Sequence, residues 1–520
     1  MLTGENFVAG ERRTGTSTFR AVEAATGDEI APDFHEASAG DITDACDAAA
    51  KAQPVFGALP SADRAAFLRL VADKIDALGD ELTRRAMAET GLPEARLNGE
   101  RGRTVGQLRL FADEVEHGEW QRLRIDHADP GRTPPKPDLR LRMIPLGPVA
   151  VFGASNFPLA FSVAGGDTAS AFAAGCCVVV KGHPAHPGTS EMVAGAIAEA
   201  VAESGLPAGV FSLLNGRANA LGEALVTDPQ ISAVGFTGSR AGGLALMRHA
   251  AAREVPIPVF AEMSSINPVV LMPHRLDEGA GDLAAQYVGS LTMGAGQFCT
   301  NPGVVLVLDG ESCERFLDEV AALLTETPAQ TMLTGAIQAN FAKGLEAASA
   351  IAGARRVALG AAGSGPCGQA AVLTVSGADF LANDGFAAEI FGPASIVVRC
   401  ADMAEVADIL RSLEGQLTTT LHMSEGDHAG ARTLVPIMEQ LAGRIIANAW
   451  PTGVDVTHAM VHGGPFPATS DGRSTSVGTL AIDRFLRPVA YQDFPHDLLA
   501  PALRDDADGL PRRVDGKREG

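Results

Sequence analysis

The chain has few basic residues for its size, and this shortage excludes several partners. Among 520 residues it has 41 Lys and Arg against 63 Asp and Glu, which gives a net charge of −22. Phosphate groups and anionic lipid surfaces repel such a chain unless a local basic patch offsets the charge, and the sequence contains no such patch. We therefore expect neither nucleic acid nor a membrane surface as a partner, and we attribute the acidity to solubility.

The sequence also lacks the patterns of a membrane, secreted or metal-binding protein. No apolar run approaches the roughly 20 residues of a membrane-spanning helix, and the first residues lack the basic start and apolar segment of a signal peptide. The seven cysteines form no CxxC pair and show no paired histidine spacing. We expect a cytoplasmic protein with reduced cysteines and no metal.

Aromatic residues make up only 5% of the chain, whereas glycine occurs 58 times. This composition predicts many tight turns and a well-packed interior that is rich in alanine. A chain of 520 residues is too long for one simple core, so we expect two or three subdomains.

The middle of the chain alternates short apolar runs with helical patterns. We expect strands at 149–152, 177–181, 210–214, 231–236 and 258–261, and helices at 168–174, 190–203, 219–227 and from 239 to 252. Such alternation indicates right-handed βαβ units and a parallel sheet, on which ligands bind at the carboxyl ends of the strands. Residues 41–116 have a helical period, and a second α/β pattern covers about 267–460.

Three further segments fall outside these patterns. Residues 127–137 contain too many prolines for a helix or a central strand, and we interpret them as an excursion. Residues 139–143 alternate apolar and charged side chains, which is typical of a half-exposed strand. We expect this strand to be an open edge. Residues 504–520 are nearly all polar or charged and are expected to fray.

Cys299 is the residue whose sequence context most clearly indicates a chemical role. It lies in the glycine-rich stretch 294–303, beside the amide of Gln297 and far from any other cysteine. This position suits a nucleophile better than a metal ligand or a disulfide.

Two polar residues follow the first strands of the predicted parallel sheet. Asn156 lies in a turn bounded by glycine and proline, where its amide could donate to a developing oxyanion or form an Asx turn. Lys181 ends an apolar strand, where it could reach a ribose and its phosphate or extend into solvent.

Two carboxylates occupy comparable places further along the chain. Glu262 leaves an apolar strand, where burial could raise its pKa and make it a base; a structural ion pair is the alternative. Glu389 lies in an apolar turn with Phe391, where it could bind a sugar hydroxyl or remain a surface carboxylate.

The turn 236–243 joins a predicted strand to a helix. Gly238 and Gly243 would let the backbone approach a ligand, and the free N–H groups at the helix start would face a phosphate. Because the turn lacks the GxGxxG pattern, a structural role is equally compatible with it.

Taken together and in order, these motifs resemble the aldehyde dehydrogenase superfamily over residues 1–500. The motifs are Asn156, Lys181, the 238–243 turn, Glu262, Cys299 and Glu389 with Phe391. The resemblance implies an α/β fold with a Rossmann-type cofactor domain (1–126 and 148–262), an α/β catalytic domain (263–465), a small oligomerisation strand region (127–147 and 466–500) and a tail (501–520). It also implies a homodimer or homotetramer, in which residues 139–143 and 487–491 pair with a second subunit.

The resemblance further implies a covalent mechanism. Cys299 attacks an aldehyde, Asn156 and the Cys299 backbone N–H hold the oxyanion, and Glu262 activates the water that hydrolyses the thioester. The cofactor residues implied are Lys181 and Glu389 at the two riboses, with Phe391 beside Glu389, and Gly238, Ser239 and Gly243 at the pyrophosphate. A CoA-acylating enzyme is disfavoured because that branch typically lacks the base at 262. The intact cysteine, amide and carboxylate also argue against a non-catalytic scaffold.

Three segments (152–167, 180–184 and 462–468) are similar to bacterial 2-oxoglutarate semialdehyde dehydrogenases and to NADP-dependent fatty aldehyde dehydrogenases. Both aldehyde classes therefore remain open as substrates. Pro184 stands where NAD-selective relatives often place a glutamate, and Arg217 could help to hold a 2′-phosphate. We expect NADP as the cofactor, with NAD possible.

The substrate site is expected near the cysteine. A dicarboxylic semialdehyde needs a cation for its far carboxylate, and Arg103 is the candidate, although a surface or structural role also fits its position. Phe157, Phe161 and Phe466 are expected to wall the tunnel. His462 lies in a glycine-rich loop that could approach Cys299, but the family's Cys–Glu pair does not require a histidine.

Overall fold

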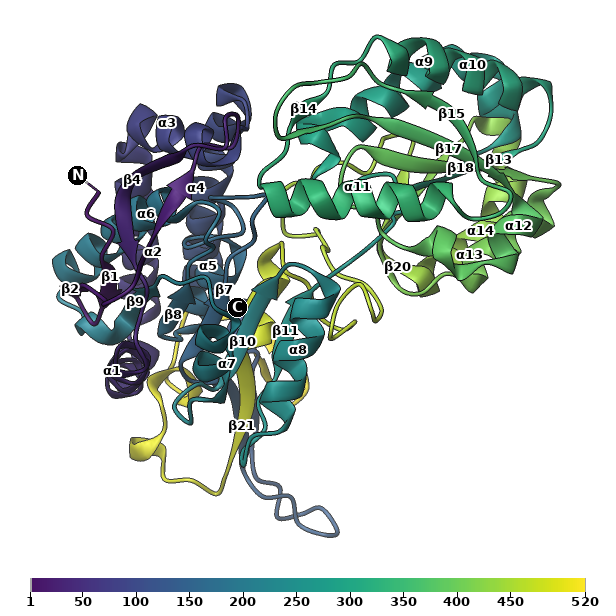
Figure 1. Cartoon of the computed structure of the whole chain (residues 1–520). Helices are drawn as coiled ribbons and strands as arrows, with labels where there is room; N and C mark the ends of the chain where they lie inside the picture. Colours follow the sequence, from purple (N-terminus) through teal and green to yellow (C-terminus); the bar gives the residue numbers. More distant parts are fainter. Residues whose placement is uncertain (1, 520) are drawn as a thin grey trace.

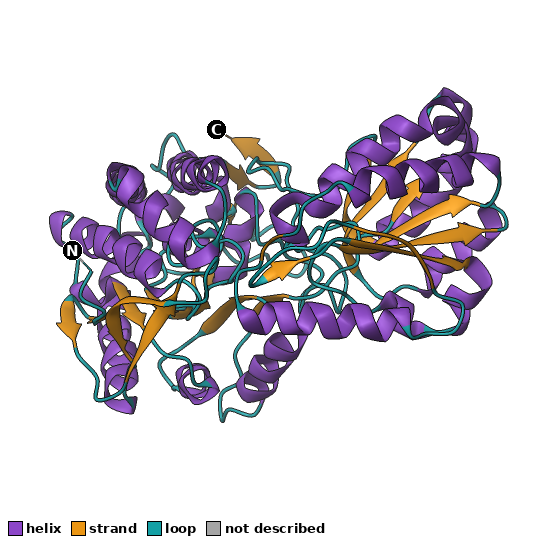
Figure 2. Ribbon diagram, turned by 45° about the horizontal axis from the view of Figure 1, so that its top comes forward, coloured by secondary structure: helices purple, strands orange, loops and turns teal. Residues whose placement is uncertain are grey.

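Two seven-stranded sheets lie in the two halves of the molecule. The structure is a computed structural model, and it describes residues 2–519. In Figure 1 the half coloured purple to teal contains the first sheet and the green half contains the second. Figure 2 shows that helices cover the sheets in both halves, so the chain is an α/β protein, as the sequence predicts.

The first sheet has the strand order β11-β10-β7-β8-β9-β1-β2; the five strands from β11 to β9 are parallel, and β1 and β2 continue the sheet in antiparallel pairs. Its strands are β1 (Asn6–Val8), β2 (Glu11–Arg13), β7 (Val149–Phe152), β8 (Val178–Lys181), β9 (Phe211–Leu214), β10 (Ala233–Thr237) and β11 (Val259–Glu262). The helices between the parallel strands are α5 (Gly166–Ala174), α6 (Pro187–Glu203), α7 (Asn219–Thr227) and α8 (Arg240–Ala251). The predicted βαβ elements are confirmed, with ends that differ by at most three residues.

The helical pattern near the N-terminus corresponds to four helices. They are α1 (Ala39–Gly57), α2 (Ser61–Ala77), α3 (Gly79–Thr90) and α4 (Glu94–His117), preceded by the hairpin of β3 (Thr18–Val22) and β4 (Glu29–His35). Ser38 and Asp41 form a capping box that starts α1. The core beneath these helices is rich in alanine, as predicted, and Phe56, Phe67 and Phe172 meet there edge to face at 5.3–5.9 Å between ring centroids.

The second sheet has the strand order β15-β17-β18-β13-β12-β19-β20, and only the β15–β17 pair is antiparallel. Its strands are β12 (Val269–Leu271), β13 (Val304–Leu308), β15 (Arg355–Leu359), β17 (Ala371–Ser376), β18 (Ala394–Cys400), β19 (Gln416–His422) and β20 (Ala442–Ala447). Its helices are α9 (Pro273–Thr292), α10 (Glu311–Thr325), α11 (Gly335–Ser349), α12 (Gly377–Ala382), α13 (Met403–Ser412) and α14 (His428–Leu441). A separate short pair joins β14 (Gln330–Thr331) to β16 (Cys367–Gly368).

A third sheet has the order β21-β6-β5-β22-β23. Its strands are β5 (Leu123–Asp126), β6 (Leu139–Pro145), β21 (Leu486–Gln492), β22 (Arg512–Val514) and β23 (Lys517–Glu519). The proline-rich excursion between β5 and β6 forms the loop at the bottom of Figure 1, closed by a bridge between Asp129 and Lys136. The expectation that 139–143 is an open edge is wrong, because β6 pairs with β21 on one side and with β5 on the other.

The expectation that residues 504–520 fray is also wrong within the described part of the chain. β22 pairs in parallel with β5, and β23 folds back on β22 as a hairpin. The outer edge of β5 offers backbone groups that need partners, and the tail supplies them. Leu499 and Leu503 pack on Leu123, and the Asp515 carboxylate accepts a hydrogen bond from the His127 backbone N–H.

A buried ion pair joins the first sheet's helix α5 to the segment that precedes β21. Arg484 Nη1 lies 2.7 Å from Asp167 Oδ1, and both side chains are buried. Arg484 also donates to Ser170 Oγ and to the Ala481 carbonyl, so its charge is well satisfied. Burial raises the pKa of Asp167, and the charge of Arg484 opposes that shift.

Arg484→Leu should destabilise the protein by about 3–5 kcal/mol, because it leaves the Asp167 carboxylate buried without its cation. The free energy of unfolding in urea measures the loss. Arg122→Leu is the matched control, since it removes a partly exposed ion pair with Asp483 and should cost at most about 1 kcal/mol. Equal losses in the two variants would contradict the prediction.

Candidate active site

Cys299 lies in a loop whose backbone is held in an unusual conformation. Before it, Gly294, Ala295 and Gly296 all have positive φ angles of 56°, 55° and 64°. A Cβ atom at Gly296 would lie 2.4 Å from the carbonyl carbon of Gly392, so only glycine fits there. This close approach places the cysteine loop against the 389–393 turn.

Side-chain amides fix the loop from both ends. Gln297 Oε1 accepts a hydrogen bond from the Leu333 N–H at 3.0 Å, and its Nε2 donates to the Gly294 carbonyl. Asn267 Nδ2 donates to the carbonyl oxygens of Cys299 and Asn301 at 2.8 and 2.9 Å. The amide of Gln297 therefore holds the loop in place and does not face an aldehyde.

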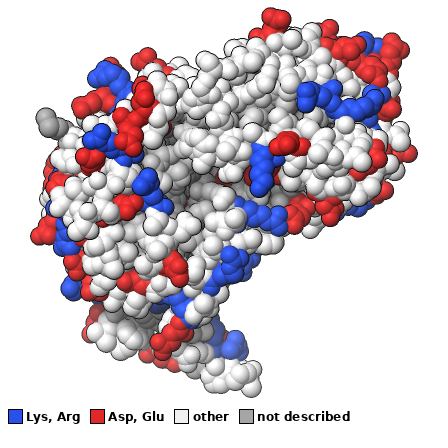
Figure 3. Space-filling model, viewed as in Figure 1, with Lys and Arg blue, Asp and Glu red and all other residues white. Residues whose placement is uncertain are grey.

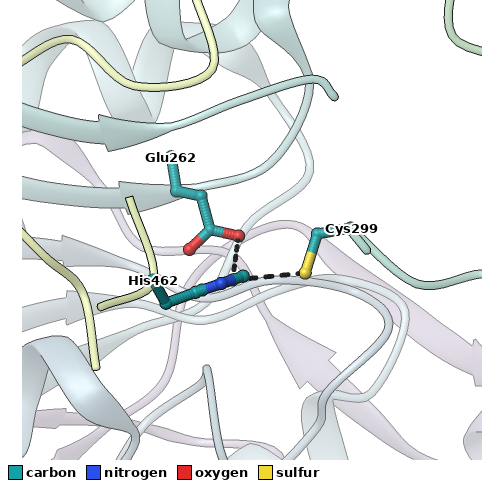
Figure 4. A group of neighbouring side chains, drawn as sticks. All are labelled: Glu262, Cys299 and His462. Atoms are coloured by element: carbon teal, nitrogen blue, oxygen red, sulfur yellow. Dashed lines mark hydrogen bonds and ion pairs between the residues drawn. The ribbon is translucent and has the colours of Figure 1, made fainter. Parts of the chain in front are cut away.

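Three side chains from distant parts of the sequence meet at the sulfur. Cys299 Sγ lies 3.3 Å from His462 Nε2, and the same nitrogen lies 2.9 Å from Glu262 Oε1 (Figure 4). Ser476 Oγ donates to the other carboxylate oxygen of Glu262 at 2.8 Å. His462 is 0% exposed. The sequence indicated that His462 could approach Cys299 but assigned it no necessary role, and Ser476 was missed altogether.

The loop that carries His462 and Ser476 is joined to the end of β11. The Met263 N–H donates to the Ala468 carbonyl, and Glu262 forms a β-bridge with Thr469. Within the loop, the Ser476 N–H donates to the His462 carbonyl at 2.8 Å. These backbone contacts bring residues 200 positions apart into hydrogen-bonding distance.

The electrostatics of this cluster correct one expectation. Burial alone would raise the pKa of Glu262, as the sequence suggested, but the electrostatic attraction and hydrogen bond of His462, with the hydrogen bonds of Ser476 and Cys299, outweigh it and lower that pKa. The pKa of the Cys299 thiol lies well above its usual range because of burial and the neighbouring Glu262 carboxylate. In the resting site, the carboxylate is ionised and the thiol keeps its proton.

Asn156 also faces the cysteine loop. Its Nδ2 donates to the Gln297 carbonyl at 3.0 Å, and its side chain is buried. A carboxamide has two N–H donors, so the second remains available for a ligand. The backbone carbonyl of Asn156 accepts from Arg96, which fixes the turn.

A cavity of about 180 Å³ opens beside Cys299. Phe157, Phe161 and Phe298 form its aromatic walls, and the ring of Phe157 meets the other two edge-on at 5.2 and 5.4 Å. Phe298 was missed from the sequence, although it directly precedes the cysteine. Phe466 was expected in this wall, and that expectation is wrong. Its side chain is 53% exposed and outside the cavity, because its loop contacts the start of β19 through the backbone at Gly415.

Arg103 projects from α4 into the same cavity. Its three guanidinium nitrogens are buried and have no hydrogen-bond partner among residues 2–519. The guanidinium lies over the ring of Phe161 at 4.9 Å, and burial lowers its pKa. A cation buried without a partner is costly. This arrangement therefore fits an anionic ligand.

The cofactor residues expected in the first sheet lie at its carboxyl edge. Lys181 ends β8 half-buried, its Nζ has no hydrogen bond or ion pair within the described chain, and burial lowers its pKa to about 8. Ser239 caps α8 by accepting from the Gly242 N–H at 3.2 Å. Gly238 and Gly243 contact the Phe236 ring and Met263, where a Cβ would lie within 2.8 Å, so a larger residue at either position would displace these side chains.

Glu389 and Phe391 line a smaller cavity, of about 20 Å³, that Gly296 and Phe298 of the cysteine loop also border. Burial raises the pKa of Glu389 to about 8. The structure thus places the Glu389 turn and the Cys299 loop together.

Two residues expected near the adenosine end line neither of the two cavities beside the cysteine loop. Pro184 is half-buried, three residues beyond the end of β8. Arg217 is exposed, with Nε 3.8 Å from Glu36 Oε1 and its guanidinium 5.5 Å from the Phe19 ring. A carboxylate therefore already accompanies the positive charge of Arg217.

The surface is mixed in charge. On the face in Figure 3, acidic and basic residues intermingle, and the hollow between the two halves is mostly uncharged. Among the described residues, no helix combines the length and apolar character needed to cross a membrane.

Comparisons with known proteins found a matching family and similar sequences. The model of the aldehyde dehydrogenase family matches residues 11–471. The chain is 54% identical over 523 aligned positions to alpha-ketoglutaric semialdehyde dehydrogenase 2 of Azospirillum brasilense, covering 100% of both chains. It is 43% identical to alpha-ketoglutaric semialdehyde dehydrogenase of Acinetobacter baylyi, covering 96% of each.

Solved structures share the fold at lower identity. A 1-pyrroline-5-carboxylate dehydrogenase from Thermus with bound NAD has a TM-score of 0.81 at 20% identity, covering 94% of this chain and 92% of that one. A lactaldehyde dehydrogenase has a TM-score of 0.81 at 21% identity, covering 94% of this chain and 98% of that one.

Glu262→Gln should move the alkylation of Cys299 by iodoacetamide to lower pH. The carboxylate raises the thiol pKa, so removing its charge lets the thiolate form at lower pH. At pH 8 we expect alkylation to be about tenfold faster for each pKa unit removed. Glu389→Gln is the control with the smaller expected shift, and Cys299→Ala gives the background from the other cysteines. An unchanged profile, or a shift to higher pH, would contradict this account of the thiol.

Proposed function

Because the chain belongs to the aldehyde dehydrogenase family, we propose that it oxidises 2-oxoglutarate semialdehyde (2,5-dioxopentanoate) to 2-oxoglutarate with NAD(P) as the acceptor. The two relatives with the highest identities given above carry the name of this activity. The assignment of the substrate rests on Arg103, because its buried and unpartnered guanidinium shares the cavity with Cys299.

The size and charge of the cavity suit a short aldehyde that has a carboxylate at its far end. A cavity of about 180 Å³ holds several water molecules and therefore has room for a short chain. The planar fork of Arg103 can bind the far carboxylate through two parallel hydrogen bonds, while the phenylalanine walls exclude water from the chain between. The alternative, a long-chain fatty aldehyde, would place alkyl groups against an unpartnered guanidinium, which is unfavourable.

Cys299 is the proposed nucleophile, and Glu262 is the proposed base. His462 Nδ1 is buried without a partner among residues 2–519, so the imidazole proton is best placed on Nε2, where it donates to Glu262. His462 then orients the carboxylate, and Glu262 takes the thiol proton as the sulfur attacks the aldehyde carbon. His462 is in this scheme a positioning residue.

Two donors are placed to hold the oxyanion that this attack creates. One is the second N–H of the Asn156 amide, and the other is the backbone N–H of Cys299, which makes no hydrogen bond to another described residue. Such donors typically contribute about 10²–10³-fold each to the rate. Glu262 then releases the thiol proton to solvent, and after oxidation the ionised carboxylate takes a proton from a water molecule, whose oxygen attacks the thioester carbon. The acid leaves, and the Cys299 sulfur recovers a proton from Glu262.

NAD(P), when bound, supplies the hydride acceptor. In our proposal Lys181 and Glu389 hold its two riboses, with Phe391 beside Glu389, and the start of α8 at Gly238, Ser239 and Gly243 faces the pyrophosphate. The unpartnered Nζ of Lys181 at the end of β8 and the free N–H groups at the start of α8 suit this ligand. We propose NADP as the preferred form. Pro184 brings no negative charge to the ribose site, and Arg217, although beside Glu36, could add a positive one.

We further propose a homodimer or homotetramer. β21 is the outer strand of the third sheet, and exposed or half-buried residues form most of it. An edge of seven residues presents unpaired backbone groups that soluble proteins cover or pair. In the same proposal residues 1–126 with 148–262 bind the cofactor, 263–465 carry the nucleophile, and 127–147 with 466–500 mediate assembly.

Arg103→Met should lower kcat/KM for 2-oxoglutarate semialdehyde by about a hundredfold, as expected for losing roughly 3 kcal/mol of charge-assisted binding. Activity on pentanal, which has no far carboxylate, should not fall. Arg101→Met is the matched control, since Arg101 lies two residues away on α4 but outside the cavity. An equal loss on both aldehydes, or a wild-type preference for long-chain alkanals, would overturn the substrate assignment.

The KM for NADP should be about tenfold or more below that for NAD, since a charge-assisted phosphate contact contributes about 1.5–3 kcal/mol. Lys181 is protonated below its pKa of about 8, so the preference should weaken as pH rises through about 8. Lys181→Ala should remove that pH dependence. Equal or lower KM values for NAD would contradict the proposal.

Sedimentation at micromolar concentration should give a dimer or tetramer, because the open β21 edge needs a partner. A monomer under these conditions would refute the proposed assembly.

A further inference from the structure

The side chains in Figure 4 combine a sulfur, a nitrogen and an oxygen that point at one another. Their potential ligand atoms, from Cys299, His462 and Glu262, all lie within 4.8 Å of one another. Thiolate, imidazole and carboxylate are the ligand types that Zn²⁺ takes in proteins. The sequence shows no metal motif, because these residues are 37 and 163 positions apart and come from three different loops and strand ends.

The distances between these atoms are close to those between the ligand atoms of a tetrahedral zinc ion. With Zn–S near 2.3 Å and Zn–N and Zn–O near 2.0–2.2 Å, tetrahedral ligands lie about 3.6 Å (S to N) and about 3.4 Å (N to O) apart. The structure has 3.3 Å and 2.9 Å for the same pairs. Outward shifts of about 0.3 and 0.5 Å would bring these two pairs to that spacing, and the half-buried Cys299 side chain can supply part of them by rotating about its Cα–Cβ bond while the loop backbone stays in place.

Charge and access also suit a divalent ion. A thiolate and a carboxylate together balance two positive charges, and a neutral imidazole completes three ligands. The fourth position would open toward the cavity beside Cys299, where a water molecule fits. We propose that Cys299, His462 and Glu262 form a tetrahedral Zn²⁺ site whose occupation blocks the nucleophile. When the ion binds, the thiol releases its proton to solvent and the imidazole proton of His462 moves from Nε2 to Nδ1, so that Nε2 can bind the ion.

Two features make this an inhibitory site and not a resident one. Metal-ligating histidines usually donate their second ring N–H to an acceptor, but His462 Nδ1 has no partner among residues 2–519. The positive guanidinium of Arg103 also lines the cavity beside the sulfur. The missing partner of His462 Nδ1 and the positive charge of Arg103 both lower the affinity for Zn²⁺ below that of a structural zinc site. A chelator should therefore remove the ion.

Binding of Co²⁺ and Zn²⁺ to the chelator-treated, full-length protein tests the site without relying on turnover. Co²⁺ should give one equivalent of thiolate-to-metal charge-transfer absorption, and Zn²⁺ should displace it. Zn²⁺ should also protect Cys299 from iodoacetamide and stop aldehyde oxidation until a chelator is added. Cys299→Ala should abolish the absorption, and His462→Gln should weaken Zn²⁺ binding by about a hundredfold. Cys367→Ala is the matched control because it removes the other half-buried cysteine, and it should bind as the wild type does.

The proposal would be overturned if no charge-transfer absorption developed, or if Cys299→Ala bound Zn²⁺ as tightly as the wild type. Inhibition that persisted unchanged in affinity in His462→Gln would likewise exclude the three-residue site. The oxidation of aldehydes in metal-free buffer is a separate measurement, so a failure of the zinc site and a failure of the proposed enzymatic function give different results.

Discussion

The hydrogen bonds that hold the buried carboxylate of Glu262 are the interaction on which the candidate site depends. A carboxylate at the end of a buried strand is tolerable only with strong partners, and His462 and Ser476 supply them at 2.9 and 2.8 Å. The same contacts tie the 462–476 loop to the end of β11 and set His462 against the sulfur of Cys299. One requirement, the satisfaction of a buried charge, thus determines the ionisation of Glu262, the protonation of the Cys299 thiol and the position of the His462 imidazole.

The loop of Cys299 separates two chemically different environments. On the side of α4 it borders an aromatic cavity with the unpartnered guanidinium of Arg103. It also contacts the turn of Glu389, where Gly296 approaches the backbone so closely that no side chain fits. In the proposed function the first environment receives the semialdehyde and the second receives the nicotinamide ribose. The strained glycine turn brings both within reach of one sulfur.

Much of the fold was predictable because its signals are local. The alternation of apolar runs and helical patterns located the strands and helices of the first sheet to within about three residues, because burial on both faces makes parallel strands continuously apolar. Strand pairing was less predictable. The tail at 512–519 looks disordered by composition, yet it completes the edge of β5, and 139–143 looks like an edge strand, yet it has partners on both sides. Neither fact has a local signal, since pairing depends on which segments lie nearby in space.

The sequence by itself determined the α/β class and, through the resemblance of its motifs, the membership of the family. It also predicted Cys299, Glu262 and Asn156 as site residues, because strand-end positions and a glycine-rich cysteine loop are contiguous patterns. Only the tertiary structure decided the environment of those residues. It lowered the pKa of Glu262 where burial alone would raise it, placed Phe298 and not Phe466 in the cavity wall, and left Arg103 buried without a partner. The solvation and electrostatic potential at a site depend on residues from the whole chain that lie near it in space. The order of these residues in the sequence does not give the distances between them.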